Sequence, residues 1–357
     1  MERASMNKWT KVVIVGSVAL SISIFAVWKR STIDGAVNEE ATIWSRMKHM
    51  NTSRLHTEPT NEKHKLDILL LVFGMKSGIG DNYETSILTL EHYRPHFSAM
   101  LYVSPLDTCQ HPAFGAVPCI DCVTYGSKHR PDTRLGYKCI IDVAMSYEQM
   151  FPGDRRGFLF MHADFWLTPS FIAAGKSFLE HHPNAHWLPG GGKAQSLKCS
   201  DLKDHAIPTV GWWWDNSACG GQERCRVNLN GNWPPQSTAV ERARTLHAKV
   251  ASPNSFLKYT PDVGQWADLY FVPKGAYHSF QLAASSLREA RVINELAVSM
   301  AMLASCDEQI GSIVFLGCWG GCCSSLQDPS MLDQQMCGHR LQLNDVAQVT
   351  ALAKKWS

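Results

Sequence analysis

Three apolar runs alternate with helix-like segments, and this alternation limits the possible fold more than any other feature of the sequence. Residues 67–73, 99–103 and 157–163 are short, largely uninterrupted apolar runs next to Gly, Ser or Pro. Such runs are typical of strands that are buried on both faces of a sheet. Segments 82–93 and 137–150, which lie between them, have apolar residues at helical spacing. The order strand, helix, strand, helix, strand predicts an α/β fold with a mostly parallel central sheet.

The second half of the chain continues the same pattern. We expect a helix over 168–180, a short strand at 186–188, a late strand at 268–272 and a long helical segment over 277–306. No stretch of different composition divides these elements. The sequence therefore predicts one compact domain over 65–357, a size that one α/β core can fill.

The charge balance excludes one class of partner. The chain has 34 Lys and Arg residues against 32 Asp and Glu residues, a formal net charge of +2. A nucleic-acid-binding protein needs a basic surface to neutralise phosphates, and this balance offers no such excess. We expect no nucleic-acid partner.

The N-terminal region contains a candidate membrane span. Lys11 and Lys29 bracket residues 12–28, a run of 17 uncharged residues. As a helix it is about 26 Å long, close to the hydrocarbon thickness of an early secretory membrane, about 27 Å. The run exceeds the apolar centre of a cleaved signal peptide, about 7–15 residues, and no small-x-small cleavage site precedes Trp28. We expect an uncleaved signal-anchor rather than a cleaved signal peptide or a buried core helix.

Two features place the C-terminal side of this span in a lumen. Asn51 begins an Asn-Thr-Ser glycosylation sequon, and the twelve cysteines suit an oxidising compartment. The flanking charges nearly balance, so they do not decide the orientation. We therefore expect a cytoplasmic tail over 1–11, the span over 12–28, a polar stem over 29–64 and a luminal body over 65–357.

The strongest chemical signal lies where the strand expected at 157–163 ends. The strand leads directly into Asp164, and His162 precedes it by two residues, so both side chains point the same way. Ligands of open α/β sheets bind outside the carboxyl ends of the strands. A carboxylate and an imidazole there can hold Mn²⁺, or the carboxylate alone Mg²⁺, and such a cation bridges a diphosphate. The alternative is that Asp164 only caps the following turn.

The segment Phe158-Leu-Phe-Met-His-Ala-Asp-Phe-Trp-Leu-Thr-Pro169 resembles the aspartate motif of the GT-A-type nucleotide-sugar glycosyltransferases. The order of elements fits that family over about residues 65–305. The resemblance implies a single Rossmann-like GT-A domain that moves a sugar from a nucleotide-sugar donor to a hydroxyl of a glycan or glycoprotein. It also implies that His162 and Asp164 bind the donor and a cation, Mn²⁺ or Mg²⁺. The family has an aspartate where this chain has His162, so a site with Asp164 alone, or without metal, stays open.

The resemblance extends to topology and location. Golgi members of the family are single-pass type II membrane proteins with a luminal catalytic domain, which matches the expected anchor and stem. The family also implies that the loop 73–80 lies by the nucleotide, so that Lys76 and Asp81 are candidate donor-binding residues. His339 is a candidate C-terminal metal ligand on the same ground.

The segment Gly211-Trp-Trp-Trp-Asp-Asn216 is the candidate acceptor site. Trp212, Trp213 and Trp214 can stack on sugar faces, and in an inverting transferase a carboxylate base takes the proton of the acceptor hydroxyl. The sequence leaves open whether the enzyme inverts or retains. Asp215 and Glu295 are the candidate bases, followed by Glu289. The alternative is that the tryptophans pack the loop onto the sheet and that the acids pair with nearby arginines.

Two other functions compete with sugar transfer. Phe73-Gly-Met-Lys-Ser-Gly-Ile-Gly80 places Lys76 and Ser77 in a Gly-rich loop between a strand and a helix, where backbone N–H groups can hold a phosphate. This loop loosely resembles the phosphosulfate-binding loop of Golgi sulfotransferases, so a sulfotransferase is the alternative enzyme. A membrane-anchored carbohydrate-binding protein without activity is the alternative from another class.

The cysteines predict disulfides rather than a zinc site. Cys119 and Cys122 have the C-x-x-C spacing, but they do not open a helix after a strand as a thioredoxin motif does. Cys219 and Cys225 bracket a short loop and are a candidate pair. A C-terminal group of four cysteines near His339 could instead bind zinc: Cys318, Cys322, Cys323 and Cys337. The connectivity does not follow from the sequence.

Overall fold

The computed structural model describes twelve stretches of the chain, all within the compact unit Met50–Ser357. They are residues 65–74, 83–104, 109–114, 118–122, 135–190, 195–203, 236–250, 267–307, 309–319, 328–339, 341–343 and 345–356. No helix within these stretches is long and apolar enough to cross a membrane. The span expected at 12–28, the stem and Asn51 lie outside the described residues.

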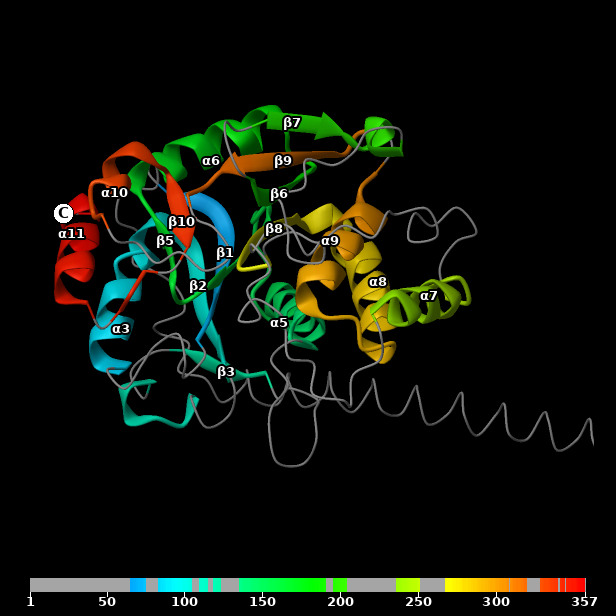
Figure 1. The fold of residues 1–357 in the computed structure, drawn as a ribbon, viewed down its shortest axis with the longest axis horizontal. Helices are drawn as coiled ribbons and strands as arrows, with labels where there is room; N and C mark the ends of the chain where they lie inside the picture. The colour runs from blue at the N-terminus through cyan, green and yellow to red at the C-terminus, as the bar shows by residue number, and fades with distance from the viewer. Residues whose placement is uncertain are drawn as a thin grey trace, which may run out of the picture. The chain divides into compact units, whose positions relative to one another are not determined.

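Eight strands form one central sheet, in the order β3-β2-β1-β4-β8-β6-β9-β7 (Figure 1). They are β1 (Leu66–Phe73), β2 (Phe97–Ser104), β3 (Cys119–Asp121), β4 (Gly157–His162), β6 (Ala185–Gly190), β7 (Gln195–Lys198), β8 (Leu269–Pro273) and β9 (Ser312–Gly317). Six strands run in one direction, and only β8 and β7 are antiparallel to their neighbours. The prediction of an α/β fold with a mostly parallel sheet is confirmed.

A second, two-stranded sheet lies next to the end of β4. It pairs β5 (Phe165–Leu167) with β10 (Cys337–His339) in antiparallel register, with His339 opposite Phe165. Because β5 follows β4 after a two-residue turn, this small sheet joins the C-terminal part of the chain to the edge of the central sheet.

Helices cover both faces of the central sheet (Figure 1). The α-helices are α3 (Tyr83–Glu91), α5 (Tyr137–Met150), α6 (Pro169–His181), α7 (Gln236–His247), α8 (Tyr277–Glu289), α9 (Asn294–Ser305), α10 (Met331–Gln334) and α11 (Val346–Trp356). The short 3-10 helices are η3 (Arg94–His96), η4 (Pro112–Phe114), η6 (Cys199–Lys203) and η9 (Lys274–Ala276). Helices α3, α6, α10 and α11 share one hydrophobic core with the small sheet, whereas α5 packs with α8 and α9.

The alternation of side chains along β1 explains the two layers. Leu66, Ile68, Leu70 and Val72 belong to the core under α3 and α6, and successive strand residues point to opposite faces. Leu69 and Leu71, which point to the other face, are fully buried as well, and this is why the sequence shows a continuous apolar run after Asp67.

The prediction of one long helix over 277–306 was wrong. The chain forms α8 and α9 instead, separated at Arg291, whose φ of 63° is left-handed. The N–H of Val292 donates to the carbonyl of Leu287 at 2.9 Å, the six-to-one bond that ends a helix in a Schellman motif. The residue in this left-handed position is usually Gly, and Arg291 gives no such signal in the sequence.

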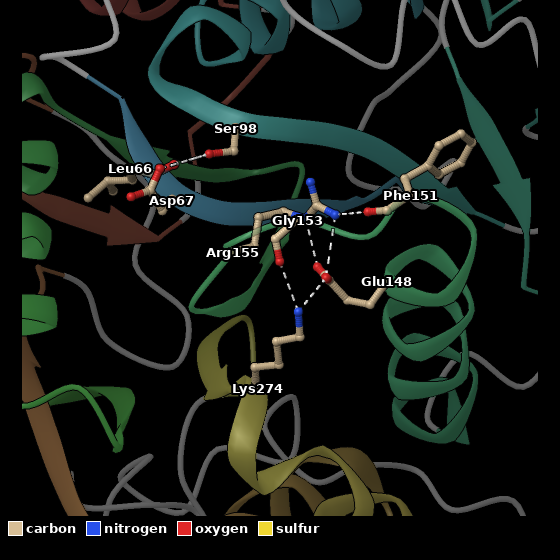
Figure 2. Close-up of polar contacts among 8 residues, drawn as sticks. All are labelled: Leu66, Asp67, Ser98, Glu148, Phe151, Gly153, Arg155 and Lys274. Carbon is tan, nitrogen blue, oxygen red and sulfur yellow. Dashed lines mark hydrogen bonds and ion pairs between the residues drawn. The ribbon is translucent and has the colours of Figure 1, made fainter.

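A buried ion cluster joins the amino end of β4 to the end of β8 (Figure 2). Glu148 of α5 accepts a hydrogen bond from Arg155 Nε at 2.7 Å and another from Lys274 Nζ at 3.0 Å. Arg155 also donates to the carbonyl of Phe151, and Lys274 donates to that of Gly153. The side chains of Glu148 and Arg155 are only 7% and 8% exposed, so this cluster fixes α5 against the sheet.

Four disulfides join described cysteines: Cys109–Cys119, Cys122–Cys139, Cys199–Cys306 and Cys318–Cys337. The prediction of disulfides is therefore confirmed for these eight residues. Cys119 and Cys122, the two cysteines of the C-x-x-C spacing, form disulfides with different partners: Cys109, which precedes β3 in the sequence, and Cys139, which follows it. The expected pair Cys219 and Cys225 lies outside the described residues.

Candidate functional site

The strand order places a binding crevice between β1 and β4. From β1 the chain adds β2 and then β3 on one side, and it returns to add β4 on the other side of β1. Ligands of open α/β sheets bind at such a switch point, outside the carboxyl ends of the strands. Phe73 ends β1 and His162 ends β4, and the two are register partners with ring centroids 5.4 Å apart.

Two aspartates meet His162 at this edge. Asp164 follows it in the turn after β4, and its Oδ1 lies 4.0 Å from His162 Nδ1. Asp268 lies closer, with its Oδ1 3.2 Å from the same nitrogen. Asp268 directly precedes β8, and because β8 runs antiparallel to β4, its first residues lie beside the last residues of β4.

His339 completes the group from the C-terminal part of the chain. Its Nε2 lies 3.5 Å from Asp164 Oδ2 and 3.7 Å from Asp268 Oδ2. The imidazole stacks on Phe165, with ring centroids 5.8 Å apart and an interplanar angle of 28°. We call His162, Asp164, Asp268 and His339 the His/Asp cluster.

The His/Asp cluster is partly accessible. The side chains of Asp164 and Asp268 are 24% and 19% exposed, whereas those of His162 and His339 are 13% and 9% exposed. The carboxylates are thus the groups that a ligand reaches first. Within the described stretches, no three or more His, Cys, Asp or Glu side chains are arranged to hold a metal ion by themselves.

A small pocket that is open to solvent adjoins His162. It is lined by Phe73, Gly136, Tyr137, Ile140, Phe160, His162, Ala267, Tyr270, Asn294 and Val298. Aromatic rings dominate its walls, and such walls suit the flat faces of a base or a sugar.

Two polar groups in this pocket have no hydrogen-bond partner among the described residues: the Tyr270 hydroxyl and Asn294 Oδ1. Tyr270 is 1% exposed, and burial raises the pKa of its hydroxyl well above the ordinary value. The hydroxyl therefore stays a neutral hydrogen-bond donor and acceptor. A buried polar group without a partner is unfavourable, so a ligand with its own donors and acceptors gains by binding here.

Two helices begin at the pocket. Gly136 precedes α5, and Asn294 is the first residue of α9. Neither start has a side-chain hydrogen bond as its cap in the described part of the chain. Helix N-termini favour negative charge, and phosphate groups are their common ligands.

The structure brings together only some of the residues that the sequence singled out. His162 and Asp164 lie together at the end of β4, and His339 lies beside Asp164. The roles of the three residues as ligands stay predictions. Glu295 lies in the first turn of α9, next to Asn294 of the pocket. Glu289 ends α8.

The other predicted site residues lie outside the described residues: Lys76, Asp81, Trp212, Trp213, Trp214 and Asp215. Sequence reasoning missed Asp268, although it recognised the strand that follows. The available signal was a carboxylate immediately before an apolar run. It indicates this site only if β8 is known to run antiparallel to β4.

Comparisons with known proteins add little to this geometry. No protein-family model matches the sequence, and no curated protein does. The crystal structure of core-mannan synthase A from Aspergillus fumigatus, in a Mn/GDP form, is similar with a TM-score of 0.30 and 9% sequence identity. The match covers 70% of this chain and 72% of that chain. A likeness at this level supports no conclusion about the ligands or the reaction of the present chain.

Proposed function

We propose that this protein is a glycosyltransferase with a GT-A-type domain that uses a nucleotide-sugar donor. The observation that carries the proposal is the convergence of the His/Asp cluster and an aromatic pocket at the switch point between β1 and β4. This position is where open α/β sheets bind nucleotides. The same arrangement offers separate surfaces for a ring, a diphosphate and a cation.

The donor is bound through three kinds of contact. The aromatic walls of the pocket stack on a ring, and Tyr270 and Asn294 form hydrogen bonds with its polar groups. The amino ends of α5 and α9 lie at the pocket, where the positive ends of the two helix dipoles favour the anionic diphosphate. The carboxylates of Asp164 and Asp268 would repel the same diphosphate, so the donor needs a cation at this edge.

We further propose that a divalent cation, Mn²⁺ or Mg²⁺, arrives with the donor rather than residing in the protein. Such cations are commonly held by one or two carboxylates together with substrate phosphates. Asp164 and Asp268 provide two carboxylates at one edge, and the described side chains provide no complete site on their own. When bound, the cation offsets the charge on the departing nucleoside diphosphate.

The acceptor is a hydroxyl of a glycan or glycoprotein, and its proton must pass to a carboxylate. Glu295 is the described candidate, because it lies next to Asn294 at the pocket. Asp215 is the candidate outside the described residues, with Trp212–Trp214 as the surface that stacks on the acceptor sugar.

We propose a Golgi location with a type II topology, a signal-anchor over 12–28 and a luminal body. The four described disulfides support an oxidising compartment. Glycosidase treatment of the full-length chain tests this topology. A change in gel mobility after glycosidase treatment that is absent in Asn51→Gln supports this topology. An unglycosylated chain whose body is digested by protease added outside intact vesicles contradicts it.

A ligand screen tests the donor class. Thermal unfolding of the full-length chain is measured with UDP, GDP or adenosine 3′,5′-bisphosphate, each with and without Mn²⁺. Stabilisation by a nucleoside diphosphate that increases with Mn²⁺ supports a glycosyltransferase. Stabilisation by the bisphosphate alone supports a sulfotransferase. Stabilisation by a glycan without any nucleotide effect supports a binding protein, and the last two outcomes refute the proposal.

A pair of variants tests the site itself. Asp164→Asn removes one charge from the His/Asp cluster and should lower transfer by about a hundredfold or more, as loss of a single transition-state contact does. Asp67→Asn is the matched control, because Asp67 lies near the start of β1, at the opposite edge of the sheet. Equal activity of Asp164→Asn and the wild type would exclude this site as the place of reaction.

A further inference from the structure

The position of His339 depends on connections made by the residues immediately before it. β10 is only three residues long, and it pairs on one side with β5, the strand that follows Asp164. The N–H of Leu341 also donates to the carbonyl of Asp164 at 2.7 Å. This side joins His339 to its neighbour in the His/Asp cluster, but both strands belong to a sheet of two short strands, which is weak when isolated.

The other side of β10 is connected to the central sheet. Trp319 follows the end of β9, and its N–H donates to the carbonyl of Cys337 at 2.8 Å. The N–H of His339 donates in turn to the carbonyl of Trp319 at 3.0 Å. The Cys318–Cys337 disulfide links the same two segments covalently, at the residue after β9 and at the first residue of β10.

Close packing beneath β10 allows little adjustment. A Cβ atom at Gly338 would lie 2.3 Å from Cζ2 of Trp166, so the backbone of the strand rests directly on the indole ring. Trp166 and Cys337 are both fully buried. β10 is therefore held between the indole ring of Trp166 and the residues that follow β9. His339 lies near both aspartates only when β10 occupies this position.

We infer that Cys318 and Cys337 are positioning residues for His339, and that their disulfide controls ligand binding at the His/Asp cluster through this imidazole. Without the disulfide, β10 is held by noncovalent contacts: its pairing with β5, the two backbone hydrogen bonds with Trp319, and the hydrogen bonds from Leu341 to Asp164 and from Thr168 to Met336. The imidazole then samples positions away from Asp164 and Asp268. The inference rests on the proposed function only where a nucleotide serves as the probe.

The test replaces both cysteines, since a single replacement would leave a thiol free to pair with Cys322 or Cys323. Cys318→Ala/Cys337→Ala is compared with Cys199→Ala/Cys306→Ala in the full-length chain. The control disulfide closes a longer loop, with a sequence separation of 107 against 19, so its loss should reduce stability more. Neither Cys199 nor Cys306 touches the cluster or the pocket as described.

The first measurement is the affinity for UDP or GDP with Mn²⁺, whichever stabilises the wild type, well below the unfolding temperature. We expect a loss of about tenfold to a hundredfold for Cys318→Ala/Cys337→Ala, the usual effect of removing a group that orients a ligating side chain. The control should stay at the wild-type value in spite of its lower unfolding temperature. Equal losses in both variants, or no loss in the first, would overturn the inference.

A double-mutant cycle separates positioning from general stability. In a His339→Gln background, removing the Cys318–Cys337 disulfide should change the affinity by no more than about twofold, the scatter of independent effects. A further tenfold loss in that background would mean that the disulfide acts by another route.

A measurement without nucleotide keeps this inference separate from the proposed function. The ring ¹⁵N resonances of His339, assigned by comparison with His339→Gln, should shift or broaden in Cys318→Ala/Cys337→Ala and stay unchanged in the control. If the wild type binds no nucleoside diphosphate, the proposed function fails while these resonances still decide the inference. Unchanged His339 resonances would refute it.

Discussion

Acidification should destabilise this fold through one buried histidine, His186. It lies in β6 and is 1% exposed. Its Nε2 is 2.9 Å from the hydroxyl of Ser305, which itself donates to the carbonyl of Met302 at 3.1 Å. The hydroxyl therefore accepts from Nε2–H, and this network assigns the tautomer. Nδ1 has no partner among the described residues, so a second proton would be placed on a buried nitrogen without an acceptor.

The size of the effect follows from the pKa. Burial lowers the pKa of His186 from 6.5 to about 3. In the unfolded chain His186 therefore binds a proton below about pH 6.5, whereas in the folded chain it stays neutral down to about pH 3. Stability is thus complete above pH 6.5 and falls as the pH decreases through this window. At about 1.4 kcal/mol per pH unit, the loss between pH 7 and pH 5 is about 2 kcal/mol.

Urea unfolding of the full-length chain at pH 7 and pH 5 measures this loss. His186→Phe keeps an aromatic ring and removes the titration, so its stability should fall by about 2 kcal/mol less than that of the wild type over the same interval. Trp187→Phe is the control, because it alters the neighbouring buried ring of β6 without any titrating group. If His186→Phe and the wild type lose the same free energy between the two pH values, the assignment to His186 is refuted.

Glu148→Gln and Gly157→Ala test the packing at the edge of the central sheet opposite the His/Asp cluster, and Ser98→Ala is a control for the first. Glu148→Gln leaves its two cationic partners facing a neutral amide and should cost about 3–5 kcal/mol in urea unfolding, the usual loss when one member of a buried ion pair is removed. Ser98→Ala is the control: it removes hydrogen bonds of an uncharged hydroxyl to the Leu66 carbonyl and to the Asp67 carboxylate, and should cost about 1 kcal/mol. Gly157→Ala should cost about 3 kcal/mol, because its Cβ would lie 2.2 Å from the carbonyl oxygen of Val272. A urea midpoint of Gly157→Ala equal to that of the wild type would show that β4 and β8 can move apart without loss of stability.

Much of the fold could be predicted because the apolar pattern and the burial agree. The run 67–73 became β1 (Leu66–Phe73), and the helix expected at 137–150 became α5 with the same bounds. Continuous apolar runs reveal strands buried on both faces, and these strands build the centre of the sheet. The strands that the sequence did not reveal are short or irregular in sequence, such as β3 (Cys119–Asp121), β5 (Phe165–Leu167) and β9 (Ser312–Gly317), whose apolar run is flanked by glycines and a cysteine.

The site was less predictable, because the positions of Asp268 and His339 depend on the direction of β8 and on a disulfide between distant residues. His162 and Asp164 could be found because His162 ends a recognisable strand and Asp164 follows that strand by two residues. Asp268 could not, because its place beside them requires β8 to run antiparallel to β4. His339 was suggested only by the family resemblance, and its place is set by a disulfide whose connectivity the sequence leaves open.

The spread of the His/Asp cluster along the chain has a consequence for synthesis. His339 follows Asp164 by 339 − 164 = 175 positions, which a ribosome adds in roughly ten to thirty seconds. Asp268 is added within this interval and Cys318 after it, so both carboxylates and Cys318 are in the nascent chain before Cys337, the cysteine that pairs with Cys318. A chain that stops before Cys337 can never close this disulfide. The site therefore acquires this disulfide only after both of its carboxylates are already in the chain.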